Sequence, residues 1–311
     1  MNVANKNSCR AYVGGAVLAV LHAAGRLGVG QGDTTGWGVP LTAIDRLEKE
    51  IESIQASGSV AVAFGVEVDV MLCARCGQPR LLWNPHSAFQ ARVCQECEWR
   101  ESCVSQRARS GVRSRHAGEV GDVRLLSVSQ LVRELSGRAL PLSLVQIDIK
   151  AIWSEYAAAR CAALVIEELR SIGQSNTAGG TGSGSGRSMG RLEILSAWPE
   201  ACYEARRYGW PSRLTCTRAA FFERKRLESW AVENGCDVLL EYPYFTKALL
   251  DDLNARGVGV MCGVCDSAVV ISELIGWGVR VFSTNELKAV VGGERLWTAS
   301  SSANVELRDI G

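Results

Sequence analysis

The sequence predicts an α/β protein, α+β overall, in which a carboxyl-terminal mixed sheet with helices follows a small four-cysteine zinc module and a helical segment. Three observations predict it: two Cys-x-x-Cys pairs within residues 60–117, helical spacing of apolar residues within 118–175, and alternating strand and helix patterns from 191 to 311. A strand, helix, strand order at this spacing requires a parallel or mixed sheet with right-handed crossovers.

The composition is that of an ordinary globular protein. A chain of 311 residues is long enough for two or three small domains, each with a core. With 22% charged and 47% hydrophobic residues, it is not a disordered chain. The formal net charge of +1 excludes an overall polyanion-binding character, although it leaves room for a local basic patch.

The amino-terminal segment, residues 1–59, is expected to be helical. Apolar residues at helical spacing (Ile44, Leu47, Ile51 and Ile54) predict a helix over 41–56, and a small-residue helix is expected over 11–30. The apolar run 11–25 raises a signal peptide as an alternative, but it is too short to span a bilayer. No later apolar run reaches the length needed to span a membrane, so no membrane association is expected. Twelve cysteines, several without an evident partner, favour a reducing cytoplasm.

The cysteine module follows a Val-rich strand region over 60–72. Cys73, Cys76, Cys94 and Cys97 form two Cys-x-x-Cys pairs separated by 17 residues, a spacing that suits tetrahedral Zn²⁺. The zinc would supply folding energy that so short a segment could hardly obtain from apolar burial. The alternatives are four buried, reduced cysteines or two disulfides.

This spacing, with Leu82-Trp83 in the first half of the loop, resembles GATA-type DNA-binding zinc fingers. Treble-clef and zinc-ribbon modules share such spacings, and the Asn-Ala-Cys-Gly sequence of GATA fingers is missing here. His86 and Cys103 are spare candidate ligands, although an ordinary surface or core role is favoured for each.

An arginine-rich tail follows the second cysteine pair. It carries Arg107, Arg109, Arg113 and Arg115 among Ser and Gly residues, without an acidic residue from 104 to 117. Arginines in such a tail bind phosphates through forked hydrogen bonds, so DNA or RNA is the expected partner. A solvated linker is the alternative.

The middle of the chain, residues 118–175, is expected to be mostly helical, with a longer helix over 152–172. Residues 176–190 are interpreted as a Gly/Ser linker and a domain boundary. The stretch 179–188 does not fit a phosphate-binding loop, because Thr181 stands at the first glycine and Arg187 at the lysine, and because a helix precedes it.

Alternating elements are expected in the carboxyl-terminal domain, 191–311. The predicted strands are 192–195, 236–242, 258–264 and 279–282, the predicted helices are 217–234, 246–255 and 267–275, and a closing hairpin is predicted from 287–291 and 296–299.

Part of this domain resembles one half of the phospholipase D superfamily, whose signature is His-x-Lys, an acid, then Gly-Ser-x-Asn. The resemblance implies that Lys288 clamps phosphate, that Ser302 and Asn304 complete the motif, and that Glu294 stands near the acid. Glu286 replaces the nucleophilic histidine, so the half-site is degenerate and expected to be inactive.

Two further motifs stand in this domain. Cys262-Gly-Val-Cys265 has redox-motif spacing but begins inside an apolar strand, so buried strand cysteines are favoured. Glu241 begins an aromatic stretch, 241–245, at the carboxyl end of a predicted strand, where open α/β sheets bind ligands.

The leading hypothesis from sequence is a zinc-containing nucleic-acid-binding protein with an inactive phospholipase D-like domain that serves as a scaffold either for binding or for homodimerisation. The first alternative is an active phosphodiesterase or nuclease of the phospholipase D superfamily that works through Lys288. The second is an assembly protein in which zinc closes a protein interface.

Overall fold

Eight parallel strands form the centre of the molecule. A computed structural model describes residues 16–22, 41–58, 61–81, 127–138, 140–150, 154–177, 191–216, 224–243 and 245–306. Its strands are β1 (Val17–Leu21), β2 (Val62–Leu72), β3 (Pro79–Leu81), β4 (Leu142–Ile149), β5 (Arg191–Ser196), β6 (Ser212–Cys216), β7 (Asp237–Leu240), β8 (Val260–Cys262) and β9 (Val281–Thr284).

The sheet closes on itself. Its order is β1-β9-β8-β7-β6-β5-β4-β2-β3, and β1 pairs in parallel with both β9 and β2. Within the described residues only β3 is antiparallel; it extends β2 beyond the ring. The structure is therefore a closed (β/α)8 barrel, the TIM-barrel fold.

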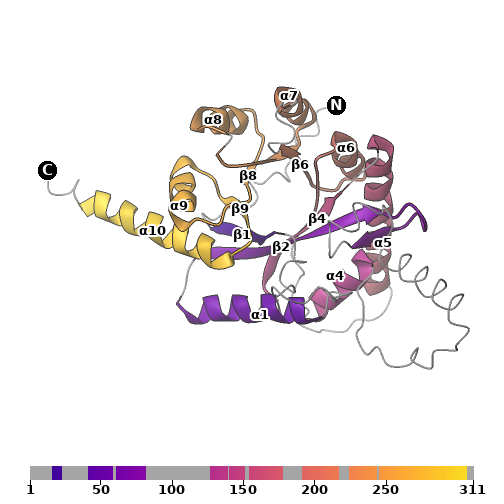
Figure 1. Cartoon of the computed structure of the whole chain (residues 1–311), viewed down its shortest axis with the longest axis horizontal. Helices are drawn as coiled ribbons and strands as arrows, with labels where there is room; N and C mark the ends of the chain where they lie inside the picture. The colour runs from indigo at the N-terminus through magenta and orange to yellow at the C-terminus, as the bar shows by residue number, and fades with distance from the viewer. Residues whose placement is uncertain are drawn as a thin grey trace, which may run out of the picture.

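A helix follows each barrel strand before the next one begins. The helices are α1 (Leu41–Ala56), α4 (Val128–Gly137), α5 (Glu155–Thr177), α6 (Pro199–Arg207), α7 (Arg224–Asn234), α8 (Lys247–Ala255), α9 (Ala268–Trp277) and α10 (Leu287–Glu306). Figure 1 shows them arranged around the strands, with α1 and α4 on one side and α7 and α8 on the opposite side. The predicted helix 41–56 is confirmed as α1.

The expected fold class is wrong in its main feature. A phospholipase D-like mixed sheet after a zinc module and a helical segment would leave the first half of the chain outside the sheet. Instead β1, β2 and β4 come from that half and complete the ring with strands from 191–284. The two halves of the chain thus depend on each other for their hydrogen-bonding partners.

Three local predictions also differ from the structure. The small-residue run expected as a helix contains β1, and the region expected to be mostly helical contains β4. Over the second half of β4, Val145 to Ile149 (VQIDI), polar residues alternate with buried aliphatic ones, and this period of two is the mark of a strand.

The predicted closing hairpin is instead the helix α10. Its Gly292-Gly293 pair resembles a turn signal, but it serves a packing contact. A Cβ atom on Gly293 would lie 2.6 Å from Cγ2 of Ile271 in α9, so glycine allows the two helices to approach closely.

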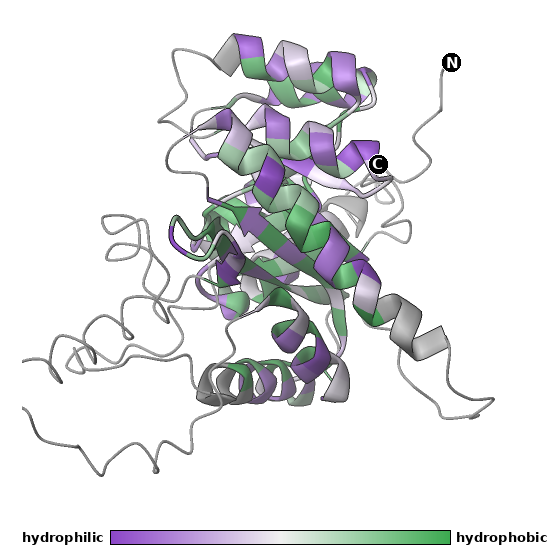
Figure 2. Ribbon diagram, turned by 90° about the vertical axis from the view of Figure 1, so that its right-hand side faces the viewer, coloured by the Kyte–Doolittle hydropathy of each residue, from purple (hydrophilic) through white to green (hydrophobic). Residues whose placement is uncertain are grey.

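Two apolar shells hold the barrel together. The larger lies between the strands and the helices, and Figure 2 shows the helices striped with hydrophobic and hydrophilic residues around largely hydrophobic strands. The smaller lies inside the barrel and consists of Leu18, Val20, Leu144, Leu195, Leu239, Met261 and Val281. None of the helices within the described ranges has the length and apolar character needed to cross a membrane.

A buried polar layer crosses the barrel interior. The Arg213 side chain is fully buried and donates to both carboxylate oxygens of Glu193 at 3.3 Å. It also donates to the Val238 carbonyl at 3.2 Å and lies 3.9 Å from Asp237 Oδ2. Gln146 donates to Glu193 at 2.6 Å. These contacts join β4, β5, β6 and β7 across the interior, so the layer closes the barrel beneath its carboxyl-terminal mouth.

We predict that Arg213→Met lowers the free energy of unfolding by about 3–5 kcal/mol, because the buried carboxylates of Glu193 and Asp237 lose their shared cation. Urea unfolding followed by circular dichroism measures the change. The double variant Arg213→Met/Glu193→Gln should recover part of the loss, since it also removes one uncompensated charge. A single variant within about 1 kcal/mol of the wild type contradicts this role for the layer.

Candidate active site

The candidate site lies at the carboxyl ends of the barrel strands, the end that carries the active site in TIM-barrel enzymes. Alternate residues of a strand point to the same face, and every second residue of β2 and β4 points into the barrel. On β2 these residues include Glu67 and Asp69, and on β4 they include Asp148. Lys150 follows β4 by one residue, and His22 follows β1 by one.

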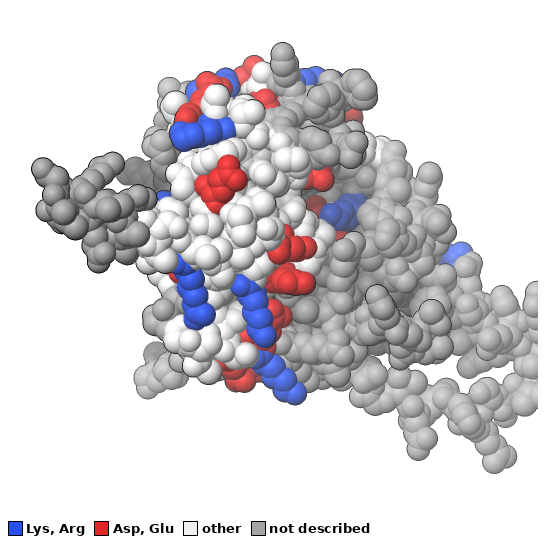
Figure 3. All heavy atoms as spheres, turned by 60° about the vertical axis from the view of Figure 1, so that its left-hand side comes forward, with Lys and Arg blue, Asp and Glu red and all other residues white. Residues whose placement is uncertain are grey.

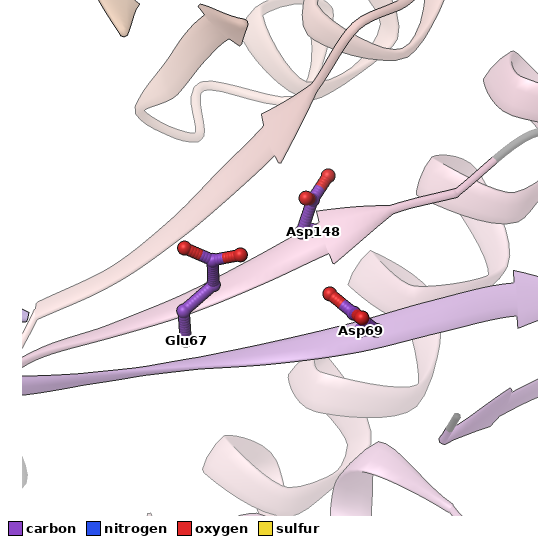
Figure 4. Close-up of side chains that lie close together, drawn as sticks. All are labelled: Glu67, Asp69 and Asp148. Atoms are coloured by element: carbon purple, nitrogen blue, oxygen red, sulfur yellow. The ribbon is translucent and has the colours of Figure 1, made fainter. Parts of the chain in front are cut away.

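Three carboxylates come together at this mouth. Glu67, Asp69 and Asp148 each have an oxygen within 4.8 Å of those of the other two, and their exposed fractions are only 2%, 6% and 4%. Asp69 and Asp148 stand directly opposite each other in the register of β2 and β4. Figure 4 shows the three side chains directed toward the same space. Like charges placed opposite each other on adjacent strands destabilise a sheet, so this arrangement is costly unless a cation offsets it.

Lys150 offsets part of this charge. Its ammonium is ion-paired with Asp148, and its Nζ lies 3.4 Å from Asp69 Oδ1. Burial lowers the pKa of Lys150, but Asp148, Asp69 and Glu67 together raise it further, so that the pKa is above its ordinary value. Lys150 therefore stays charged throughout the physiological pH range.

One lysine does not neutralise three acids. Burial raises the pKa of Asp148 to about 6, with Asp69 adding to the rise and Lys150 opposing it. Burial, followed by the charge of Asp148, holds the pKa of Glu67 well above its ordinary range. These shifts mean that the group binds protons strongly in the absence of another cation.

The acid group fits a divalent metal ion. Its donors are carboxylate oxygens, the ligands preferred by Mg²⁺, Ca²⁺ and Mn²⁺. The buried oxygen Asp69 Oδ1 accepts no hydrogen bond from the described residues and meets Lys150 only as an ion pair, so it can take a cation as well. A metal was expected from sequence, but at cysteine sulfurs; the side chains of Glu67, Asp69 and Asp148 could hold one at oxygens.

His22 stands beside the acid group on the next strand. Its Nε2 lies 3.7 Å from Glu67 Oε1, and its Nδ1 lies 3.3 Å from Asn285 Oδ1. Its side chain is 23% exposed, so it is reachable from the mouth. An imidazole in this place can exchange a proton with a molecule bound at the acid group.

A cavity of about 430 Å³ opens over these residues. His22, Glu67, Asp148 and Lys150 line one side, and the remaining lining residues are Leu195, Thr215, Leu239, Glu241, Gly263, Val264 and Ser283. A Cβ atom on Gly263 would lie 2.5 Å from that of Ser283, so only glycine fits in this wall. The charged residues of the cavity lining are thus suited to bind an anion together with a metal ion, and the rest of the lining is of mixed polarity.

The residues that the sequence assigned to catalysis lie elsewhere. Lys288, Glu294, Ser302 and Asn304 all belong to α10, outside the ring of strands. Lys288 is exposed, and Glu294 accepts a hydrogen bond from Thr298 at 2.9 Å within the same helix. Neither of these two residues lines the cavity. Glu241, noted for its place at a strand end, does line it.

The residues assigned to zinc and nucleic acid are only partly described. Cys73 is buried and Cys76 half-buried, and they bracket the turn between β2 and β3, where the Gly77 amide donates to the Cys73 carbonyl at 2.8 Å. Cys94, Cys97, Arg107, Arg109, Arg113 and Arg115 lie outside the described residues. On the face shown in Figure 3, Lys and Arg residues are interspersed with Asp and Glu, without an extended positive field among the described residues.

The site could have been found from two short stretches. In Val66-Glu67-Val68-Asp69-Val70 the acids occupy alternate positions of an apolar strand, and Gln146-Ile147-Asp148-Ile149-Lys150 repeats the pattern. Because alternate residues of a strand point to the same face, the polar residues of each stretch lie together on one face. Charged residues are rarely found within a buried apolar strand, so the pattern is unusual. The first strand was predicted from its valines without regard to its acids, and the second strand was missed.

Solved structures with the same fold include glycerophosphodiester phosphodiesterases. No protein-family model matches this sequence, and a search of curated proteins finds no significant match. A glycerophosphodiester phosphodiesterase from Parabacteroides distasonis matches with a TM-score of 0.55 and 14% identity, over 92% of this chain and 99% of that one.

Two other structures match similarly. An Oleispira antarctica phosphodiesterase in complex with its product sn-glycerol-3-phosphate has a TM-score of 0.56 and 12% identity, covering 92% of this chain and 98% of that one. A candidate glycerophosphoryl diester phosphodiesterase from Silicibacter pomeroyi has a TM-score of 0.56 and 15% identity, covering 88% and 92%. These likenesses establish the TIM-barrel fold along nearly the whole chain.

The leading sequence hypothesis is therefore wrong. A nucleic-acid-binding protein with a zinc finger and a phospholipase D-like domain is incompatible with one barrel that resembles glycerophosphodiester phosphodiesterases over about nine-tenths of the chain. The alternative of a phosphodiesterase agrees better with these neighbours, although in a different fold from the one expected.

We predict that the raised pKa of Asp148 makes the metal-free protein lose stability as the pH rises. The folded state holds this proton up to about pH 6, whereas the unfolded chain releases it near 3.8. The folded state therefore binds more protons between these values, and the free energy of unfolding falls as pH increases through them. Urea unfolding from pH 4 to 7, with a chelator present, measures the slope.

Asp148→Asn is the matched variant, because it keeps the shape of the side chain and removes the titration. The stability of the wild type relative to this variant should decrease from pH 4 to 7. If the stability of the wild type relative to Asp148→Asn instead increases from pH 4 to 7, the pKa of Asp148 is not raised by burial and the description of the three acids is contradicted. Adding Mg²⁺ or Ca²⁺ at pH 7 should stabilise the wild type more than the variant.

Proposed function

We propose that this protein is a metal-dependent phosphodiester hydrolase that acts on small phosphodiesters of the glycerophosphodiester class. The observation that carries the proposal is that His22, Glu67, Asp148 and Lys150 line one cavity at the carboxyl end of the barrel, with the carboxylate of Asp69 grouped beside those of Glu67 and Asp148. The shared fold of the glycerophosphodiester phosphodiesterases supports it, and the product named in the Oleispira antarctica structure suggests the glycerol-bearing substrate class.

Each side of the cavity has a distinct task in this proposal. Glu67, Asp69 and Asp148 hold a divalent cation, which when bound neutralises phosphate charge and polarises the phosphorus centre. Lys150, which lines the cavity and stays charged, binds a phosphate oxygen and keeps the phosphodiester next to the acids. The remaining lining residues, which include Leu195, Leu239 and Glu241, accommodate the alcohol portion.

In this proposal His22 is the general acid or base that transfers the proton. Hydrolysis consumes one water, breaks one P–O bond, places the hydroxyl on phosphorus and leaves the proton on the departing alcohol. The imidazole of His22 faces the cavity beside Glu67, so it takes the proton from the attacking group or delivers it to the leaving oxygen. Such proton transfer contributes about 10²–10⁴-fold to the rate.

We predict that Lys150→Met lowers kcat/KM for glycerophosphocholine, a simple glycerophosphodiester, by about 10²–10³-fold, because the variant loses the fixed cation that binds the phosphate. Released sn-glycerol-3-phosphate measures the rate, with Mg²⁺, Ca²⁺ and Mn²⁺ tested in turn. Chelation should abolish hydrolysis, and returning the metal should restore it.

Lys247→Met is the matched control, since it removes an exposed lysine that pairs with Asp251 on α8 and does not line the cavity. It should retain the wild-type rate. The proposal fails if the wild type hydrolyses no phosphodiester with any of the three metals, or if Lys150→Met is as active as the control.

A further inference from the structure

We infer that Asp266 and Asn285 form a positioning relay that fixes which nitrogen of His22 carries the proton. The inference concerns how the imidazole is held, and it rests on the proposed function only for its effect on rate. Neither residue lines the cavity, so neither is placed to touch a bound substrate. Their effect on the site would come through the contact of Asn285 with His22. Asp266 lies between β8 and α9, Asn285 directly follows β9, and His22 directly follows β1, so the relay spans three consecutive barrel strands.

The relay begins at the carboxylate of Asp266. Its Oδ1 accepts from the Thr284 hydroxyl and from the Asn285 backbone amide, each at 2.7 Å. Its Oδ2 accepts from Asn285 Nδ2 at 2.8 Å. Burial raises the pKa of Asp266, but these hydrogen bonds from Asn285 and Thr284 outweigh it and hold the pKa below its usual value. The carboxylate is therefore ionised and can only accept hydrogen bonds.

An acceptor at this place determines the orientation of the Asn285 amide. The atom of the amide that faces Asp266 must be the nitrogen, because an oxygen there would oppose the carboxylate without a hydrogen atom between them. The amide oxygen consequently points the other way, toward Nδ1 of His22 at a distance of 3.3 Å. Asn285 thus converts the negative charge of Asp266 into a fixed acceptor beside the imidazole.

The acceptor in turn determines the tautomer of His22. In the neutral imidazole one nitrogen donates and the other accepts, and Nδ1 must donate to reach Asn285 Oδ1. Nε2 is then the nitrogen with a lone pair, and it lies on the side of Glu67 and the cavity. In the opposite tautomer Nε2 would already carry a hydrogen and could not accept a proton from a bound molecule.

The test uses ¹⁵N-labelled histidine, whose protonated and unprotonated ring nitrogens have well-separated chemical shifts. The chain has three histidines, and the spectrum of His22→Gln identifies the signals of His22 by their loss. At a pH where the imidazole is neutral, we expect the wild type to show Nδ1 protonated and Nε2 unprotonated. The measurement needs neither metal nor substrate.

Two variants remove the relay at different points. Asp266→Asn introduces an amide that no longer fixes the orientation of Asn285, and Asn285→Ala removes the acceptor itself. In both, the signals of His22 should shift toward a mixture of tautomers, and kcat should fall by about 10–100-fold with KM nearly unchanged. Asp266→Glu, which restores an acceptor-only side chain, should return part of the wild-type tautomer pattern.

Asp251→Asn is the control for charge, because it removes one exposed carboxylate on α8 and should alter neither readout. Thermal unfolding identifies any variant that fails to fold, and the three substitutions provide independent tests of the relay. The inference is overturned if His22 carries its proton on Nε2 in the wild type, or if its tautomer pattern is the same in Asp266→Asn and Asn285→Ala as in the wild type. If His22 shows the expected tautomer but the protein has no phosphodiesterase activity, the proposed function is refuted and the inference about the relay still holds.

Discussion

The mutual repulsion of three buried carboxylates is the constraint around which this molecule is built. Glu67, Asp69 and Asp148 lie within 4.8 Å of one another, and one lysine shares their space. Removing charges from water and placing them together costs several kcal/mol per ion unless further charge or hydrogen bonds compensate. The rest of the barrel supplies the free energy that keeps them there, and a divalent cation would relieve the strain.

The pairing of β2 with β4 is what makes this arrangement possible. The acids stand on adjacent strands β2 and β4, whose register pairs Asp69 with Asp148, so the sheet itself fixes their separation. Beneath them the layer around Arg213 provides a second group of charges, which is held together by its own ion pairs and hydrogen bonds. The charges around Arg213 are thus paired with one another, whereas the three acids nearer the mouth have more negative charge than Lys150 can neutralise. This asymmetry distinguishes the interior around Arg213 from the candidate site at the mouth of the barrel.

Several elements of the carboxyl-terminal half were predicted from sequence, because each of these has a complete local signal. β6 and α6 were not predicted, and α10 was predicted as a hairpin. Strand runs such as 236–242 end in turn residues, and helices such as α8 begin at a capping residue, Thr246. The strands β1 and β4 were not predicted, each for a different reason. The small apolar residues of β1 suit a helix as well as a buried strand, and β4 was included in a longer run of helical spacing.

The site itself could not be predicted from a linear motif. Its residues lie on or directly after β1, β2 and β4, which are far apart in sequence and become neighbours only when these strands pair. The conspicuous features, paired cysteines and a lysine near a Ser-x-Asn sequence, pointed to 73–97 and 288–304 instead. A charged residue at alternate positions in an apolar strand was the better signal, since burying an acid there needs a reason.

The most direct test of the account is the location of a bound metal ion. Crystals of the full chain grown with Mn²⁺ should show an anomalous difference peak among the carboxylates of Glu67, Asp69 and Asp148, at oxygen-ligand distances of about 2.0–2.6 Å. The same crystals of Asp148→Asn should show a weaker peak or none. A wild-type structure with no peak at the three acids, or with manganese bound only elsewhere in the molecule, would contradict the central claim.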